Sequence, residues 1–274
     1  MYSNNNKSNG FTLVELSIVL VIIGLLVGGI LIGQSLINTA QINSFIRQIQ
    51  QYDIAVANFK STYKCLPADC KSFGGNGDGL ITEAGGIQDD TFNGEIGSFW
   101  NILTSLKLIK NNVVYSNTAT SGIRAGVNVP KSSIGKNTGI LVACEWENTV
   151  RGGGSDMQDY ADWDGKYNYY HIFSTAGTTS DSILTGTAGL DYSLSVNDTL
   201  AIDSKMDDGN AIKGDVRVAS NFERIAFYNG SPTYNQTAGS GCVLPGDNSK
   251  YNMSSTSAYP CALLIPLLSQ IGGK

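Results

Sequence analysis

The chain has 274 residues, of which 15% are charged, and its formal net charge is −5. A protein that grips the nucleic-acid backbone needs a basic surface, so this balance argues against a nucleic-acid partner. The length is sufficient for one sizeable domain with its own core after an N-terminal segment is set aside.

An apolar segment close to the N-terminus dominates the sequence. No charged side chain occurs from Leu16 to Ile32, where Leu, Ile and Val prevail. As a helix, a run of this length crosses about 30 Å of hydrocarbon. Glu15 lies at its start, although a carboxylate at the bilayer centre costs about 2.5–3.5 kcal/mol. A short polar stretch, residues 1–10, precedes it with Lys7 as its basic residue.

Three interpretations of this segment compete. A secretory signal peptide has a shorter apolar core and then a small-residue cleavage site, and no such site follows here. A plain signal anchor leaves Gly10, Phe11 and Glu15 unexplained. The third interpretation is a leader that is cut before the apolar run, on the cytoplasmic side, so that the hydrophobic helix stays on the mature protein.

The heptapeptide Gly10-Phe11-Thr12-Leu13-Val14-Glu15-Leu16 resembles the processing motif of type IV pilins and of the pseudopilins of type II secretion systems. The resemblance implies that a prepilin peptidase removes residues 1–10 by cutting after Gly10. It implies further that the new N-terminal residue, Phe11, is methylated. Glu15 is similar to the glutamate that guides docking of pilin subunits into a helical filament.

The physical chemistry of Glu15 supports this role. After cleavage, Phe11 carries an ammonium that stays cationic when it is methylated. A buried carboxylate is tolerated when it is paired, and the ammonium of a neighbouring subunit would be that partner. The alternative role for Glu15 is a first-turn acid that complements the helix dipole.

One long helix is predicted from about Phe11 to Lys64, ended by Pro67. From residue 34 to residue 66 there is neither glycine nor proline. Apolar residues in this part recur at helical spacing, at Ile42, Phe45, Ile46, Ile49, Tyr52, Val56, Phe59 and Tyr63. We expect residues 11–33 to lie in a membrane or in a filament core, and residues 34–66 to pack on the globular domain.

Residues 67–274 are predicted to form an α+β globular domain, in which an antiparallel sheet packs on the second half of the long helix, as in a pilin-like roll. Short helices are expected at Ser98–Ile109 and at Asn197–Asp207, with Asn197 as the cap of the latter. The apolar alternation predicts strands at Gly139–Trp146, Tyr167–Phe173, Asp215–Ala219 and Arg224–Tyr228.

The five cysteines are Cys65, Cys70, Cys144, Cys242 and Cys261, and none of them form a CxxC pair. With one histidine in the chain, a zinc ligand set is hard to assemble. A domain exported to the periplasm meets oxidising conditions, so we predict disulfides Cys65–Cys70 and Cys242–Cys261, and place Cys144 in a strand. The resemblance supports the second pair, because many type IV pilins join their C-terminal region by a disulfide.

One glycine-rich loop has the pattern of a metal site. Residues 76–81 match the middle of an EF-hand calcium loop, with Asn76 and Asp78 as ligands. Gly74 stands where the first acidic ligand belongs, and Glu83 falls short of the closing position. Major pseudopilins are known for a calcium site in a loop. The two interpretations are therefore a Ca²⁺ site and a plain glycine-rich turn.

The sequence contains neither a G-x-S-x-G nor a P-loop motif, and His171 lies in an expected strand, where a structural role is favoured over catalysis. Five aromatic residues crowd one region: Tyr160, Trp163, Tyr167, Tyr169 and Tyr170. They suit core packing better than a sugar-binding platform.

The resemblance implies a structural subunit, not an enzyme, that needs no cofactor apart from the possible Ca²⁺. Its expected location is the bacterial inner membrane, as a single-pass protein with its domain in the periplasm. Its expected partners are a prepilin peptidase and other pilin or pseudopilin subunits in a type IV pilus or a type II secretion pseudopilus. The alternative is a minor pilin that acts as an adhesin, with its large C-terminal domain binding a surface or a glycan.

Overall fold

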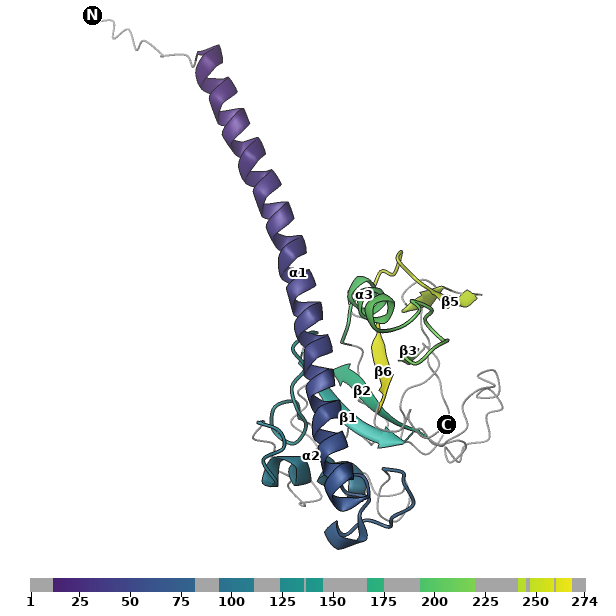
Figure 1. Ribbon diagram of the computed structural model, residues 1–274. Helices are drawn as coiled ribbons and strands as arrows, with labels where there is room; N and C mark the ends of the chain where they lie inside the picture. Colours follow the sequence, from purple (N-terminus) through teal and green to yellow (C-terminus); the bar gives the residue numbers. More distant parts are fainter. Residues whose placement is uncertain are drawn as a thin grey trace, which may run out of the picture. The chain divides into compact units, whose positions relative to one another are not determined.

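The computed structural model describes residues 12–81, 94–110, 124–135, 137–144, 167–174, 193–219, 241–244, 247–258 and 260–267. The chain divides into two compact units, Met1–Gln41 and Ile42–Lys274. The described residues form a long N-terminal helix, shorter helices and antiparallel sheets (Figure 1). This is the α+β architecture that the sequence predicts.

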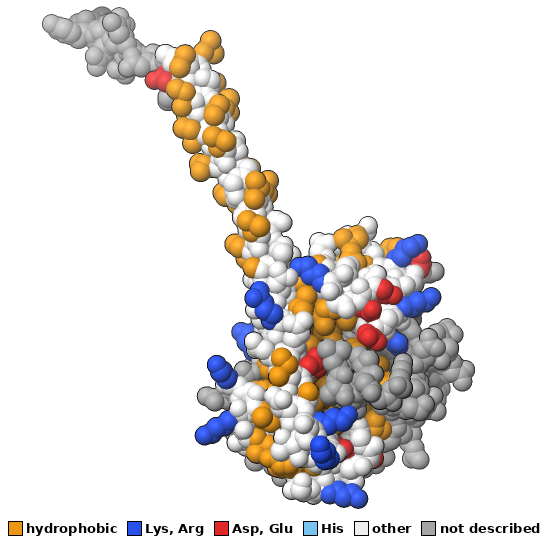
Figure 2. Space-filling view, in the orientation of Figure 1, with side chains coloured by type: hydrophobic (Ala, Val, Ile, Leu, Met, Phe, Trp, Pro, Cys, Tyr) orange, Lys and Arg blue, Asp and Glu red, His pale blue; other side chains and the backbone are white. Residues whose placement is uncertain are grey.

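Helix α1 comprises Leu13–Tyr63, close to the predicted bounds. It ends where Lys64 adopts a left-handed conformation with a φ of 64°, shortly before Pro67. Every large apolar side chain from Leu13 to Ile37 is at least 50% exposed. Figure 2 shows these side chains along the first part of α1. The first unit therefore has no core of its own among its described residues, and its helix presents apolar groups to its surroundings.

In the second unit, α1 buries one face. The buried apolar residues are Ile42, Phe45, Ile49, Tyr52, Ala55, Val56 and Phe59. Their spacing of three and four residues is that of one helix face, as predicted. Ile46 is partly buried at the edge of this face, and Tyr63 is 40% exposed. The ring of Tyr63 instead contacts the rings of Phe59 and Phe73.

A four-stranded antiparallel sheet forms the second layer, in the order β1-β2-β6-β3. Its strands are β1 (Thr138–Cys144), β2 (Asn168–Ser174), β3 (Arg217–Ala219) and β6 (Ala262–Pro266). The first three lie within or beside predicted strands, whereas β6 was not predicted. The strand predicted at Arg224–Tyr228 lies outside the described residues.

Helix α2, Gly94–Ser105, joins α1 to the sheet. It lies earlier in the sequence than predicted, because Lys107 adopts a left-handed conformation with a φ of 56° and ends it. Its Trp100 is fully buried, and the ring packs against Tyr52 of α1 and Tyr170 of β2, with centroid distances of 4.8 and 6.3 Å. Trp100 is thus a centre of the core between the two layers.

Helix α3 comprises Val196–Met206. Its N-cap is Ser195, whose Oγ accepts a hydrogen bond from the Asp198 backbone N–H at 3.1 Å. The prediction of Asn197 as the cap was wrong. Both residue types cap helices, and the extended backbone of Ser195 decides between the two positions.

Two short strands, β4 (Val243–Leu244) and β5 (Asp247–Tyr251), pair in a separate antiparallel sheet. Both predicted disulfides are present, Cys65–Cys70 and Cys242–Cys261. The first closes the turn after α1, and the second joins the residue before β4 to the residue before β6. Cys144 is the half-buried last residue of β1 and takes part in neither disulfide.

Candidate functional site

Thr12 and Glu15 close the N-terminus of α1 with reciprocal hydrogen bonds. The backbone N–H and the hydroxyl of Thr12 each donate to Glu15 Oε2 at 2.8 Å. The Glu15 backbone N–H donates to Thr12 Oγ1 at 3.2 Å. This is a capping box, in which Thr12 is the N-cap and Glu15 the third helical residue. Gly10 and Phe11, where cleavage is predicted, lie outside the described residues.

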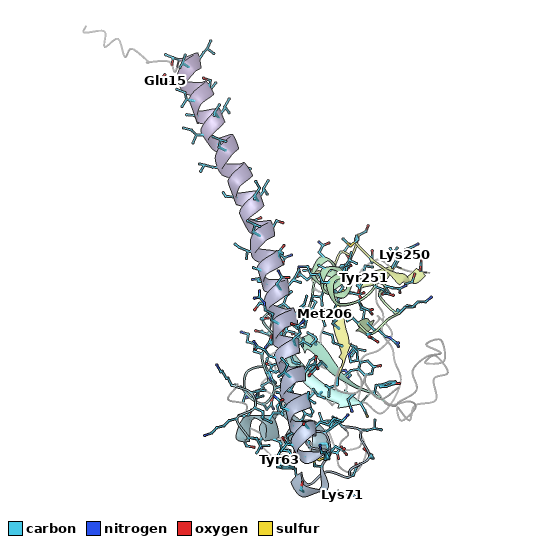
Figure 3. The ribbon with its side chains drawn as sticks, viewed as in Figure 1. Glu15, Tyr63, Lys71, Met206, Lys250 and Tyr251 are labelled. Carbon is cyan, nitrogen blue, oxygen red and sulfur yellow. A yellow bond between two sulfur atoms is a disulfide. The ribbon has the colours of Figure 1, made fainter. Side chains whose placement is uncertain are left out.

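The apolar surface of α1 begins at this cap. Figure 3 shows Glu15 at the N-terminal end of the helix. By length and composition, α1 is long and apolar enough to cross a membrane, and the most apolar part of it is not buried. An exposed apolar surface of this extent marks a region that lipid or another protein covers.

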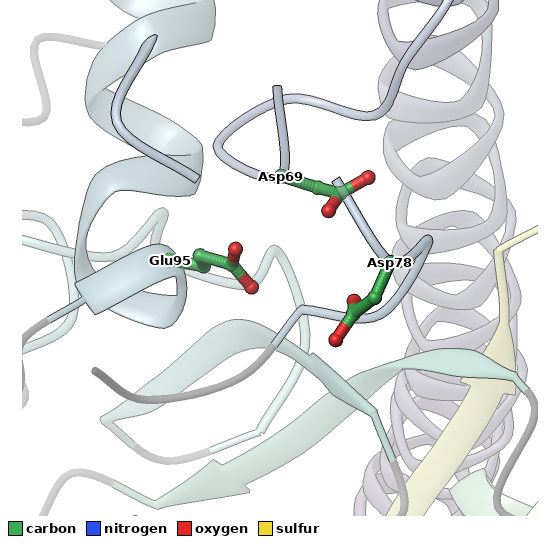
Figure 4. Close-up of side chains that lie close together, drawn as sticks. All are labelled: Asp69, Asp78 and Glu95. Atoms are coloured by element: carbon green, nitrogen blue, oxygen red, sulfur yellow. The ribbon is translucent and has the colours of Figure 1, made fainter. Parts of the chain in front are cut away.

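A second candidate site lies in the second unit, where three carboxylates meet. One oxygen from each of Asp69, Asp78 and Glu95 lies within 4.8 Å of the other two (Figure 4). Asp69 and Glu95 are buried, with 3% and 7% of their surface exposed, whereas Asp78 is exposed. Of these three residues the sequence pattern indicated Asp78 and missed Asp69 and Glu95.

Asn76, the other predicted ligand, takes part in the turn itself. Its Oδ1 accepts a hydrogen bond from the Asp78 backbone N–H at 2.9 Å, and its Nδ2 donates to Asp78 Oδ2 at 2.7 Å. The Asn76 backbone N–H donates to Glu95 Oε1 at 2.9 Å. Asp69 Oδ2 accepts from the Gly79 backbone N–H at 3.2 Å. Two buried carboxylates therefore hold the glycine-rich loop in place.

The loop is also fixed to the rest of the domain. A Cβ on Gly75 would overlap the Ala68 carbonyl and the Asp69 backbone, so this close approach requires glycine. Asn168 of β2 accepts from the Ile81 backbone N–H at 2.7 Å and donates to the Gly79 carbonyl at 3.0 Å. These contacts give the loop a defined position beside the sheet.

Two of the described residues that were considered for catalysis or for glycan binding, Tyr170 and His171, lie in the core, whereas Tyr167 and Tyr169 are partly buried. Tyr170 is fully buried and donates to Asp53 Oδ1 at 3.0 Å. Burial, and then the charge of Asp53, raise the pKa of Tyr170 well above its usual value. His171 is 4% exposed, and burial lowers its pKa to about 4. Tyr160 and Trp163 lie outside the described residues.

Another group of carboxylates, Asp203, Asp207 and Asp208, lies at the end of α3. Asp203 is fully buried and accepts hydrogen bonds from the Tyr251 hydroxyl at 2.7 Å and from the Gly209 backbone N–H at 3.2 Å. Burial raises the pKa of Asp203 to about 6, and Asp208 and Asp207 add to the rise while the two hydrogen bonds oppose it. This group ties α3 to β5.

Asp203→Asn is expected to change how the stability of the domain depends on pH. The pKa of Asp203 in the folded protein, about 6, exceeds its ordinary value of 3.8, so the folded state binds the proton more tightly. The contribution of Asp203 to the free energy of unfolding therefore falls as the pH rises from about 4 to about 6. The asparagine of the variant would keep an acceptor for Tyr251 and carry no charge.

The measurement is thermal unfolding of the two proteins in detergent between about pH 4 and pH 7, the range that contains both pKa values of Asp203. The Tm of the variant minus that of the unmodified protein should increase as the pH rises through this range. Asp198→Asn, in the first turn of the same helix, is the control. A constant difference in Tm between Asp203→Asn and the unmodified protein would contradict the prediction.

Residues 5–31 match the family model of the prokaryotic N-terminal methylation motif. The match contains Gly10, Phe11 and Glu15 together with most of the apolar part of α1. Comparisons with curated proteins and with solved structures gave no significant match. The motif is the signature of structural subunits, and the long N-terminal helix with its antiparallel sheet is consistent with their fold. The chain thus carries the N-terminal signature of the type IV pilins and pseudopilins on a pilin-like α+β fold.

Proposed function

We propose that the chain is a structural subunit that a prepilin peptidase cuts after Gly10. It then assembles through its N-terminal helix into a type IV pilus or a type II secretion pseudopilus. The observation that carries the proposal is the methylation motif at residues 5–31, directly joined to a helix whose apolar side chains are exposed. Its partners are the peptidase and other subunits of the same kind.

The apolar part of α1 supports an exchange of lipid for protein contacts. Lipid is as apolar as leucine, so close packing between helices must favour the filament over the membrane. Gly24, Gly28, Gly29 and Gly33 lie in this part, and a Cβ on any of them would meet no atom of the described residues within 4 Å. These glycines leave the helix surface open to a neighbouring helix, which could then approach closely.

Glu15 favours the filament over the separate subunit in the membrane. In the separate subunit it accepts hydrogen bonds from its own Thr12. After cleavage, the Phe11 ammonium of another subunit offers a partner of opposite charge, which the neutral donors of Thr12 do not. A carboxylate that is costly in lipid thereby becomes paired in the filament.

The proposed location is the inner membrane, with residues 1–10 in the cytoplasm and residues 67–274 in the periplasm. The two disulfides, Cys65–Cys70 and Cys242–Cys261, support this orientation. Such bonds persist in the periplasm, and reducing systems keep thiols reduced in the cytosol. The leader would be cut on the cytoplasmic face, before the helix enters the membrane.

Gly10→Val tests the proposed processing. The side chain of valine should block the peptidase, which in this family cuts after glycine, so the full chain with its N-terminal leader should accumulate in the membrane. Mass analysis of the protein extracted from cells that carry the machinery measures this. The unmodified chain should begin at Phe11 and carry one added methyl group. Asn9→Ala, a change in the adjacent leader residue, is the control and should be processed normally. An unmodified chain that keeps residues 1–10 would overturn the proposal.

A further inference from the structure

Three segments of the second unit bring carboxylates to one place. Asp69 lies in the turn after α1, directly before Cys70 of the first disulfide. Asp78 lies in the glycine-rich loop, and Glu95 in the first turn of α2. Figure 4 shows the three carboxylate groups facing a common space between these segments. One oxygen of each lies within 4.8 Å of the others.

The burial of Asp69 and the hydrogen bonding of its carboxylate indicate which kind of ligand would suit this space. Asp69 is 3% exposed, and its Oδ1 is buried without a hydrogen-bond partner among the described residues. Buried polar atoms of folded proteins nearly always have a partner. The neighbouring side chains, Asp78 and Glu95, accept hydrogen bonds when ionised and have no proton to donate. A cation between the three groups would satisfy this oxygen and balance the neighbouring charges.

The ligand chemistry favours calcium. The three side chains supply oxygen alone, which suits hard cations and not zinc or copper. Calcium binds six to eight oxygens at about 2.4 Å, so two oxygens on opposite sides of one ion lie about 5 Å apart. The separation of the three oxygens, within 4.8 Å, fits this span. Magnesium demands a strict octahedron at about 2.1 Å and usually keeps several waters, so a site of three protein carboxylates suits it less well.

We propose that Asp69, Asp78 and Glu95 form a calcium site that joins the turn after α1 and the glycine-rich loop to helix α2. The ligand set differs from the one that the loop pattern suggests, since the Asn76 side chain is used in the turn. Loop carbonyls and water would complete the coordination. Through α2 and its Trp100, the ion stabilises the packing of the second unit.

The test uses the full processed chain in detergent, treated with a chelator and then titrated with CaCl₂ or MgCl₂. We expect one calcium per chain by calorimetry, with weaker binding of magnesium. At a calcium concentration a hundredfold above Kd, the Tm should rise by roughly 5–10 °C. No heat of binding and no change in Tm up to about 10 mM calcium, well above the Kd of weak extracellular sites, would overturn the proposal.

Asp69→Asn tests whether the calcium binds at these three carboxylates. The asparagine would keep an acceptor for the Gly79 backbone N–H and lose the charge, so calcium binding and the rise in Tm should both disappear. In chelator the variant should unfold at or above the Tm of the unmodified protein, because one of three repelling charges is gone. Asp208→Asn, in the other group of carboxylates, is the matched control and should bind calcium normally.

Two results would contradict the assignment: calcium binding by Asp69→Asn with unchanged affinity, or loss of binding in Asp208→Asn alone. Should Asp69→Asn fold poorly, Glu95→Gln gives the same comparison, since its glutamine would keep an acceptor for the Asn76 backbone N–H. The titration of the unmodified chain tests the existence of the site without any variant. None of these measurements depends on filament assembly.

Discussion

Glu15→Ala is expected to leave cleavage after Gly10 intact and to reduce incorporation of the subunit into filaments at least tenfold. Without the carboxylate, the Phe11 ammonium of the neighbouring subunit is left buried and unpaired. Removing one partner of a buried ion pair costs about 3–5 kcal/mol, and each 1.4 kcal/mol changes an equilibrium tenfold. The variant also lacks the charge that makes lipid unfavourable, so the membrane-bound subunit gains stability at the same time.

Glu15→Gln separates the two roles of this residue. Glutamine at the third helical position can still accept from Thr12 and complete the capping box, but it has no charge. If pairing with the ammonium matters, Glu15→Gln should assemble nearly as poorly as Glu15→Ala. Normal assembly of Glu15→Gln would show that capping is the main role of Glu15. Incorporation is measured as the ratio of the subunit in sheared filaments to the subunit in membrane fractions, each probed for the subunit.

Ser17→Ala is the matched control for both Glu15 variants. Ser17 is another polar residue in the apolar segment, and its hydroxyl donates to the Val14 carbonyl of its own helix at 2.8 Å. Its loss removes a hydrogen bond within the subunit and no charge. Both processing and assembly should therefore stay close to those of the unmodified chain.

The sequence predicts the features that repeat or that lie close together in the chain. The helix α1 follows from an apolar run and then a periodic face, and both signals extend over many residues. Cys65 and Cys70 are near neighbours, and the second disulfide was supported by resemblance as well. In contrast, β6 consists of a short apolar run before Pro266, which carries no alternation because the whole strand is buried.

The carboxylate group could not be predicted for a different reason. Asp69 follows a helix-ending proline and Glu95 begins α2, and the chain between them is long. No local pattern places these two side chains together, since their positions depend on how α2 packs against α1. The loop pattern could indicate Asp78 because the alternation of Asn76 and Asp78 with glycines is local. A buried acid is recognised from the fold and not from its neighbours in sequence.

Trp100→Ala is expected to destabilise the second unit by about 3–5 kcal/mol, the cost of truncating a large buried aromatic side chain. Trp100 is fully buried, and its ring contacts Phe99 of α2, Tyr52 of α1 and Tyr170 of β2. Truncation opens a cavity at the point where both helices meet the sheet. The aromatic rings around this cavity would lose some of their contacts, because a packed core relaxes only partly after truncation.

Trp100→Phe shows that the loss comes from the ring contacts. Trp100 Nε1 is buried without a hydrogen-bond partner in the described part of the chain, so phenylalanine removes an unsatisfied donor and keeps most of the packing. Its loss of stability should be clearly smaller than that of Trp100→Ala. Ile54→Ala, at a 60% exposed position of α1, should change stability by less than about 0.5 kcal/mol. Denaturant unfolding of the three variants in detergent measures the order, and equal losses for Trp100→Ala and Ile54→Ala would place Trp100 outside the core.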